Sequence, residues 1–271
     1  MDRRIEQLCA WCGPAFLVVL VVGLWFVAGL IPPPSPSDSA EHIAAFYRAH
    51  AGQVRLGMLI CMLGSVLLAP FIALISRQIR RSSPRLELLA DVQLICGVIA
   101  VVILLLFELL LATIAFRPDM SPQVLRALND LAWTTLLWPF SPFSLEYAAI
   151  GVAVLTDRRE HPLHPRWVGL VSLLVAALFA LGGPTLWAMH GAFSWDGLLT
   201  LWVVLGSFGL WVSVMCWSMI RAIALQGKAI PPQGKAIPPQ GKAIPPQGKA
   251  IPLQGKAFPP QGRAILPREG D

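Results

Sequence analysis

Charged residues are scarce in this chain. Only 13% of its 271 residues are Asp, Glu, Lys or Arg, whereas about a quarter are charged in typical soluble domains. Hydrophobic residues make up 56% of the sequence. This composition argues against an ordinary soluble domain and favours a chain that lies within a membrane.

Cysteines are few, and familiar catalytic motifs are missing. Neither H-E-x-x-H nor G-x-S-x-G occurs, so the signatures of zinc proteases and serine hydrolases are absent. Cys9 and Cys12 have C-x-x-C spacing but no βαβ context, which favours two small residues at a helix start over redox or metal chemistry. We therefore predict no catalytic residue, no metal and no cofactor.

The apolar residues fall into six long blocks. About 20 such residues are needed to cross ~30 Å of hydrocarbon as a helix. The blocks are residues 14–31, 56–75, 92–116, 131–155, 167–189 and 198–220. We predict an all-α fold, a polytopic bundle of six transmembrane helices over residues 1–222. No cysteine falls in a predicted outer loop, so no disulfide framework is expected.

The basic residues are unevenly distributed between the two predicted sides. With the N-terminus inside, 17 of the 21 Lys and Arg lie on the inner side. The four on the outer side are Arg48, Arg55, Arg117 and Arg126. Cytoplasmic loops carry such an excess, which predicts a plasma-membrane protein with both termini cytoplasmic. The net charge of +6 then indicates attraction to anionic lipid through basic loops and tail, and no nucleic-acid binding.

Two short amphipathic helices are predicted on the outer surface. Asp38 and Glu41 have the spacing of a capping box, and residues 40–50 place their apolar side chains on one face. Ser121 followed by Pro122 is typical of a helix N-cap and first turn, leading into the fourth span.

The C-terminal segment, residues 223–271, carries a heptapeptide repeat. Its units read GKAIPPQ three times and then diverge through GKAIPLQ and GKAFPPQ to GRAILPR. The prolines forbid a continuous helix and favour polyproline II structure or disorder. We interpret this tail as a solvated cytoplasmic spacer with weak attraction to anionic lipid.

The fourth span contains two prolines, Pro139 and Pro142. Each lacks the amide that would bond a backbone carbonyl one turn earlier, so the helix is expected to kink or break. In lipid the freed carbonyls need other partners or a cavity. The nearby hydroxyl groups are those of Thr135, Ser141 and Ser144.

Two glutamates, Glu108 and Glu146, lie inside predicted spans that contain no Lys or Arg. Such residues suggest a functional site by default. In one account they are protonated and hydrogen-bonded, which is a structural role. In the other they point inward and toward each other and share a proton, as a proton or cation carrier requires. With the proline break and nearby hydroxyls they form the candidate intramembrane site.

The histidines offer weaker candidates. His161 and His164 lie three apart in a proline-containing inner loop without fitting cysteine or carboxylate partners. His42, His50 and His190 lie on the predicted outer side. Metal binding or proton entry is the alternative interpretation, and loop residues without ligands are the simpler one.

Four segments resemble a group of uncharacterised bacterial multi-pass membrane proteins. They read SAEHIAAFYRAH (39–50), RPDMSPQVLRALNDLAW (117–133), PRWVGLVSL (165–173) and SWDGLLTLWV (194–203). The resemblance covers about residues 14–221 and excludes the repeat tail. It implies a membrane bundle and brings no activity, ligand or partner.

Three functional hypotheses follow from the sequence. The first is an accessory or scaffold membrane protein that binds lipid or a protein partner, with both glutamates satisfied internally. The second is a small proton- or cation-linked transporter that uses Glu108, Glu146 and the helix break, because discontinuous helices often mark such sites. The third, an intramembrane enzyme, lacks a nucleophile or metal constellation. A water-accessible cavity reaching both carboxylates would favour the second.

Overall fold

The structure, a computed structural model, describes residues 3–159 and 162–228. Within these ranges all regular elements are helical, which confirms the predicted all-α class for this part of the chain. The elements are α1 (Arg3–Leu20), η1 (Val21–Val27), α2 (Ala40–Ser65), α3 (Leu68–Ser82), η2 (Pro84–Leu86), α4 (Glu87–Phe116), α5 (Pro122–Leu137), α6 (Phe140–Thr156), α7 (Arg166–Phe179), η3 (Ala180–Leu186), η4 (Leu198–Val203) and α8 (Val204–Lys228).

Five helical stretches are long and apolar enough to cross a membrane. They are Arg3–Val27, Ala40–Ser82, Glu87–Phe116, Arg166–Leu186 and Leu198–Gln226. The remaining predicted span, 131–155, is divided between α5 and α6, helices of 16 and 17 residues. Five of the six predicted spans therefore correspond to long apolar helices, and the sixth predicted span is divided into two shorter helices.

The two short outer helices do not exist as separate elements, so this prediction is wrong. Residues 40–50 are the first part of α2, which continues to Ser65 because its buried face repeats through Ile43, Tyr47, Val54 and Met58. Likewise, the residues after Ser121 continue into α5. The first part of α2 is hydrogen-bonded to α5, because the Tyr47 hydroxyl donates to Asn129 Oδ1 at 2.8 Å.

The two predicted helix starts have different outcomes. Ser39 rather than Asp38 caps α2, because its Oγ accepts from the His42 amide at 3.2 Å. Asp38 instead accepts from the Ser35 amide. Ser121 is the N-cap of α5 with Pro122 in the first turn, as predicted. At the other end of the chain, residues 223–228 continue α8, and the remaining repeat tail, 229–271, lies outside the described residues.

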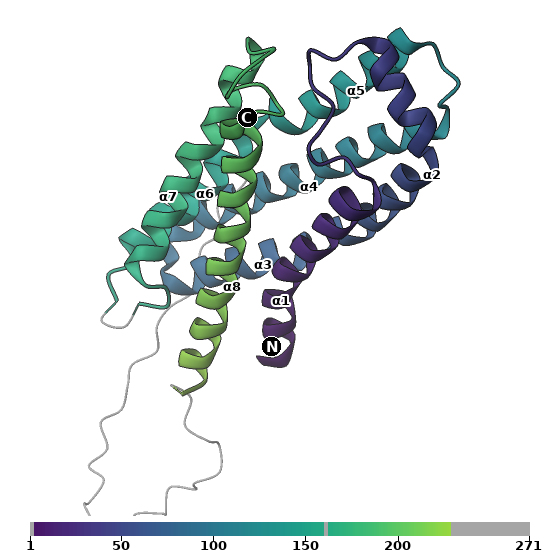
Figure 1. Cartoon of the computed structure of the whole chain (residues 1–271). Helices are drawn as coiled ribbons and strands as arrows, with labels where there is room; N and C mark the ends of the chain where they lie inside the picture. Colours follow the sequence, from purple (N-terminus) through teal and green to yellow (C-terminus); the bar gives the residue numbers. More distant parts are fainter. Residues whose placement is uncertain (1–2, 160–161, 229–271) are drawn as a thin grey trace, which may run out of the picture. The chain divides into compact units, whose positions relative to one another are not determined.

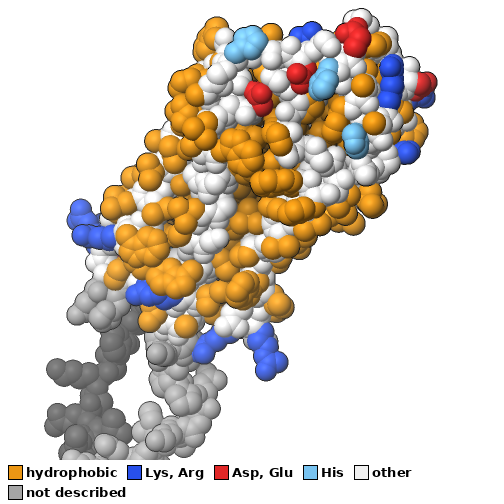
Figure 2. Space-filling view, in the orientation of Figure 1, with side chains coloured by type: hydrophobic (Ala, Val, Ile, Leu, Met, Phe, Trp, Pro, Cys, Tyr) orange, Lys and Arg blue, Asp and Glu red, His pale blue; other side chains and the backbone are white. Residues whose placement is uncertain are grey.

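Helix α4 is the central element of the bundle. It contacts α2, α3, α5 and α6, while α1 packs against α2, α3 and α8, and α7 packs against α6 and α8 (Figure 1). Hydrophobic side chains cover the middle of the face in Figure 2, and Lys and Arg lie at both ends. The visible His, Asp and Glu lie toward one end, so that the other, the basic end, shows Lys and Arg alone among the charged side chains. An apolar band between polar ends is the surface that a bilayer requires.

Segment η1, which continues α1, and helix α2 approach closely through glycine. A Cβ added at Gly57 would lie 2.4 Å from the carbonyl oxygen of Gly23, and one added at Gly23 would lie 2.5 Å from Cys61 Sγ. Small residues permit such backbone contact between membrane helices, where packing rather than water drives association.

Replacing Gly57 with alanine therefore tests this contact. The added methyl group meets a backbone atom that cannot move aside, so we expect Gly57→Ala to lower the free energy of unfolding by about 1–3 kcal/mol. Gly52→Ala is the matched control in the same helix, because nothing lies within 4 Å of its added Cβ. Denaturation with SDS in mixed micelles measures both, and equal effects would contradict the close approach.

Candidate functional site

Glu108 points into the bundle from α4. Its side chain is fully buried, and Oε1 accepts a hydrogen bond of 2.6 Å from Ser65 Oγ at the end of α2. Oε2 is buried without a hydrogen-bond partner among the described residues. The inward orientation confirms the prediction, and the Ser65 bond gives Glu108 an internal partner.

Glu146 also points inward, from α6 against α4. Its Oε1 accepts a hydrogen bond of 3.1 Å from Gln93 Nε2. Gly97, one turn further along α4, makes room for the carboxylate, since a Cβ there would lie 2.8 Å from Glu146 Oε1. Glu146 therefore sits beside the turn from Gln93 to Gly97.

The two glutamates do not face each other, so this part of the prediction is wrong. Glu108 follows Gly97 by 11 residues on the same helix, a rise of about 16 Å. The reason is the length of α4: its 30 residues extend about 45 Å, more than the ~30 Å that a hydrocarbon core measures. Two carboxylates at such different heights cannot share a proton directly.

The predicted helix break occurs at Pro139. Helix α5 ends at Leu137, and α6 begins at Phe140. Pro142 causes no second break, because it lies in the first turn of α6, where its missing amide has no helical partner to lose. Backbone bonds close the break, from the Trp138 amide to Thr134 O and from the Phe140 amide to Trp138 O.

The hydroxyl groups expected to pair with the carbonyls freed at the break do not do so. Thr135 Oγ1 donates to Leu131 O at 2.7 Å, one turn earlier in its own helix. Ser141 is exposed, and Ser144 Oγ is buried without a partner among the described residues. The prolines and hydroxyls of the candidate site therefore do not gather around either glutamate.

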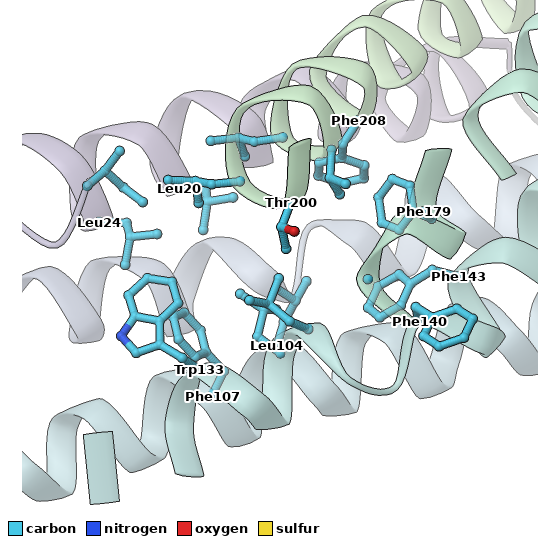
Figure 3. Close-up of a pocket in the computed structure, with 17 residues that line it drawn as sticks. Leu20, Leu24, Leu104, Phe107, Trp133, Phe140, Phe143, Phe179, Thr200 and Phe208 are labelled. Atoms are coloured by element: carbon cyan, nitrogen blue, oxygen red, sulfur yellow. The ribbon is translucent and has the colours of Figure 1, made fainter. Parts of the chain in front are cut away.

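The break instead borders an apolar cavity of about 120 Å³ (Figure 3). Every helix of the described bundle except α2, α3 and η2 contributes lining side chains, among them Leu20, Leu104, Trp133, Phe140 and Phe179. Thr200 is the hydroxyl-bearing residue of the lining, and its Oγ1 donates to Phe193 O. The cavity suits an apolar molecule.

Several irregular helical segments meet at this cavity. The π-helical segments η1 and η4, the 3-10 segment η3 and the α5–α6 break all supply lining residues. Non-helical backbone at membrane depth is tolerated where it lines a cavity, and π-segments often accompany functional sites. Sequence reasoning identified the proline break and missed the π-segments, which no proline marks.

A second cavity, of about 20 Å³, lies next to the first. Leu104, Phe143 and Phe208 line both cavities. The smaller one reaches Glu146, whereas Glu108 lines neither. Glu146 therefore adjoins one of these two cavities, and Glu108 adjoins neither.

A polar network joins helix ends at the basic end of the bundle. Glu6, which is 3% exposed, pairs with Arg81 at 2.8 Å and with Arg77 at 3.4 Å. Arg81 also donates to Gln226 Oε1 at 2.9 Å, so the first and last described helices meet here. Asp91 of α4 also accepts a hydrogen bond from Arg80.

His164, in the loop between α6 and α7, is a buried residue rather than an exposed ligand. It is 5% exposed, and its Nδ1 lies 2.7 Å from Ser218 Oγ. Burial, aided by the positive charge of Arg159, lowers the pKa of His164 to about 4. No cluster of three His, Cys, Asp or Glu suited to a metal occurs among the described residues, and His161 lies outside them.

Comparisons with protein-family models, with curated proteins and with solved structures find no match for the chain. The resemblance to bacterial multi-pass proteins therefore stays a prediction, and functional argument depends on the cavities and glutamates themselves.

The buried His164 predicts a pH-dependent stability. Unfolded histidine binds a proton below pH ~6.5, whereas His164 stays neutral in the folded chain down to about 4. Stability is thus complete above pH ~6.5 and falls as the pH drops toward 4, by about 2 kcal/mol between pH 7 and pH 5. We expect His164→Asn to reduce this loss in thermal melts. His50→Asn, at an exposed histidine of α2, is the control, and an identical pH response of both variants would contradict the assignment of this pH dependence to His164.

Proposed function

We propose that this chain is an accessory integral membrane protein that holds an apolar molecule, such as a lipid chain, in the cavity at the α5–α6 break. The supporting observation is the combination of size and lining. Apolar cavities of about 150 Å³ in proteins stay dry and bind molecules of the size of benzene. The cavity at this break, at about 120 Å³ with a nearly all-apolar wall, is similar in kind.

The arrangement of the two glutamates favours this function over proton- or cation-linked transport. Glu108 and Glu146 accept from different partners, Ser65 and Gln93, at different heights on α4. A shared-proton carrier needs the two carboxylates within direct reach of each other. Each glutamate has one internal hydrogen-bond donor, which meets in part the internal satisfaction expected of an accessory bundle.

We further propose six crossings with both termini cytoplasmic in the plasma membrane. In this topology α5 and α6 together form one broken crossing. The contacts of Arg81 with Glu6 of α1 and Gln226 of α8 support an even number of crossings, because they bring both ends of the described bundle together. The basic residues at this end support the cytoplasmic side.

Filling the cavity tests the ligand-binding role. Leu201 lines the cavity and is 6% exposed, whereas Leu198, in the same segment, is 63% exposed. We expect Leu201→Trp to lower the occupancy of co-purified lipid about tenfold in native mass spectrometry, while Leu198→Trp leaves it unchanged. Equal lipid occupancy in both variants, with similar melting temperatures, would contradict the role of the cavity.

Reporter fusions test the topology. A fluorescent protein that folds only in the cytoplasm is expected to fluoresce when fused after Asp271. Alkaline phosphatase, which is active only outside the cytoplasm, is expected to be active when fused to the chain truncated after Asp38. The reverse pattern would overturn the proposed orientation.

A further inference from the structure

Five of the ten residues that line the small cavity next to Glu146 are aromatic. Its aromatic walls are Phe71, Phe143, Tyr147, Phe208 and Trp211, and Glu146 is its one ionisable carboxylate. The ring centroids of Tyr147 and Trp211 are 4.5 Å apart, and those of Phe71 and Trp211 are 6.3 Å apart. Trp211 is held in place by a hydrogen bond of 3.1 Å from its Nε1 to Ser172 Oγ.

Glu146 has hydrogen-bonding capacity left over. Gln93 donates to Oε1, and no described residue donates a hydrogen bond to Oε2. The predicted spans contain no Lys or Arg that could neutralise the carboxylate. A carboxylate in low dielectric without a cationic partner is costly. A cationic ligand would supply the positive charge that these spans lack.

Aromatic faces and a carboxylate together recognise ammonium groups. The negative face of an aromatic ring attracts a cation, and this attraction is strongest in desolvated sites. A carboxylate adds a charge-assisted hydrogen bond to an N–H donor. Neutral apolar ligands gain nothing from Glu146, whereas a protonated amine uses both features.

We propose that the two cavities form one site for a lipophilic primary amine, with its ammonium group beside Glu146 and its apolar body in the larger cavity. Leu104, Phe143 and Phe208, which line both cavities, then flank the junction between head and body. The smaller volume of about 20 Å³ exceeds slightly what one water molecule needs. It therefore admits –NH₃⁺ and excludes a trimethylammonium group. This inference rests on the proposed function, because the same larger cavity holds the apolar body.

The test compares three probes that share one body: phenylbutylamine, phenylbutanol and phenylbutyltrimethylammonium. Binding is measured by isothermal titration calorimetry to the full chain in nanodiscs of neutral lipid, with empty nanodiscs subtracted. For the wild type we expect the primary amine to bind about tenfold more tightly than the alcohol, because only the amine makes a charge-assisted bond. The trimethylammonium probe is expected to bind more weakly than the primary amine.

Two variants locate the effect. Glu146→Gln is expected to abolish the preference for the amine over the alcohol. Glu108→Gln is the matched control, since Glu108 is equally buried and lines neither cavity, and it should keep the preference. The comparison of amine with alcohol on the wild type needs no variant. It therefore tests the amine site even if Glu146→Gln fails to fold.

The outcomes separate this inference from the proposed function. Equal binding of amine and alcohol to the wild type would overturn the amine site and leave an apolar cavity intact. Binding of none of the probes would count against both. An amine preference that survives Glu146→Gln, or disappears in Glu108→Gln, would overturn the assignment of Glu146.

Discussion

Backbone hydrogen bonding is the constraint on which this structure depends. A bilayer offers no water to an exposed amide or carbonyl, so each departure from helical pairing needs a partner within the protein. The chain meets this need locally. In η1 the Ala28 amide bonds Gly23 O at 2.9 Å, and at the α5–α6 break the Phe140 amide bonds Trp138 O at 2.8 Å. These local hydrogen bonds allow irregular segments and a helix break within the bundle without leaving those backbone amides unpaired.

The cavity follows from the same irregularities. Two regular helices can interdigitate their side chains along a shared face, but a π-segment or a proline break shifts the side chains out of that spacing. Here η1, η3, η4 and the break all supply walls of one cavity, where the side chains leave space unfilled. At the basic end of the bundle, the buried carboxylate of Glu6 pairs with Arg81. Without this partner, burial of its charge would be costly.

The sequence predicted the features that depend on local pattern. Long apolar runs identified five spanning helices, and Pro139 identified the break, because a missing amide acts wherever it occurs. The separation of Glu108 from Glu146 could not be predicted, since it depends on α4 being longer than the bilayer core. The cavity could not be predicted either, because its walls come from helices distant in sequence. The continuity of α2 beyond residue 50 could be read from the spacing of Ile43, Tyr47 and Val54. We missed it because we predicted a separate outer helix over residues 40–50.

The two glutamates show why a buried charged residue does not by itself define a site. Both are nearly fully buried, both point toward the axis of the bundle, and each accepts one hydrogen bond from a neighbouring helix. Their difference lies in the adjoining space. Glu108 lines neither of the two cavities. Glu146 borders the smaller cavity, among aromatic rings. The space beside a carboxylate, rather than its depth in the membrane, therefore distinguishes the two glutamates.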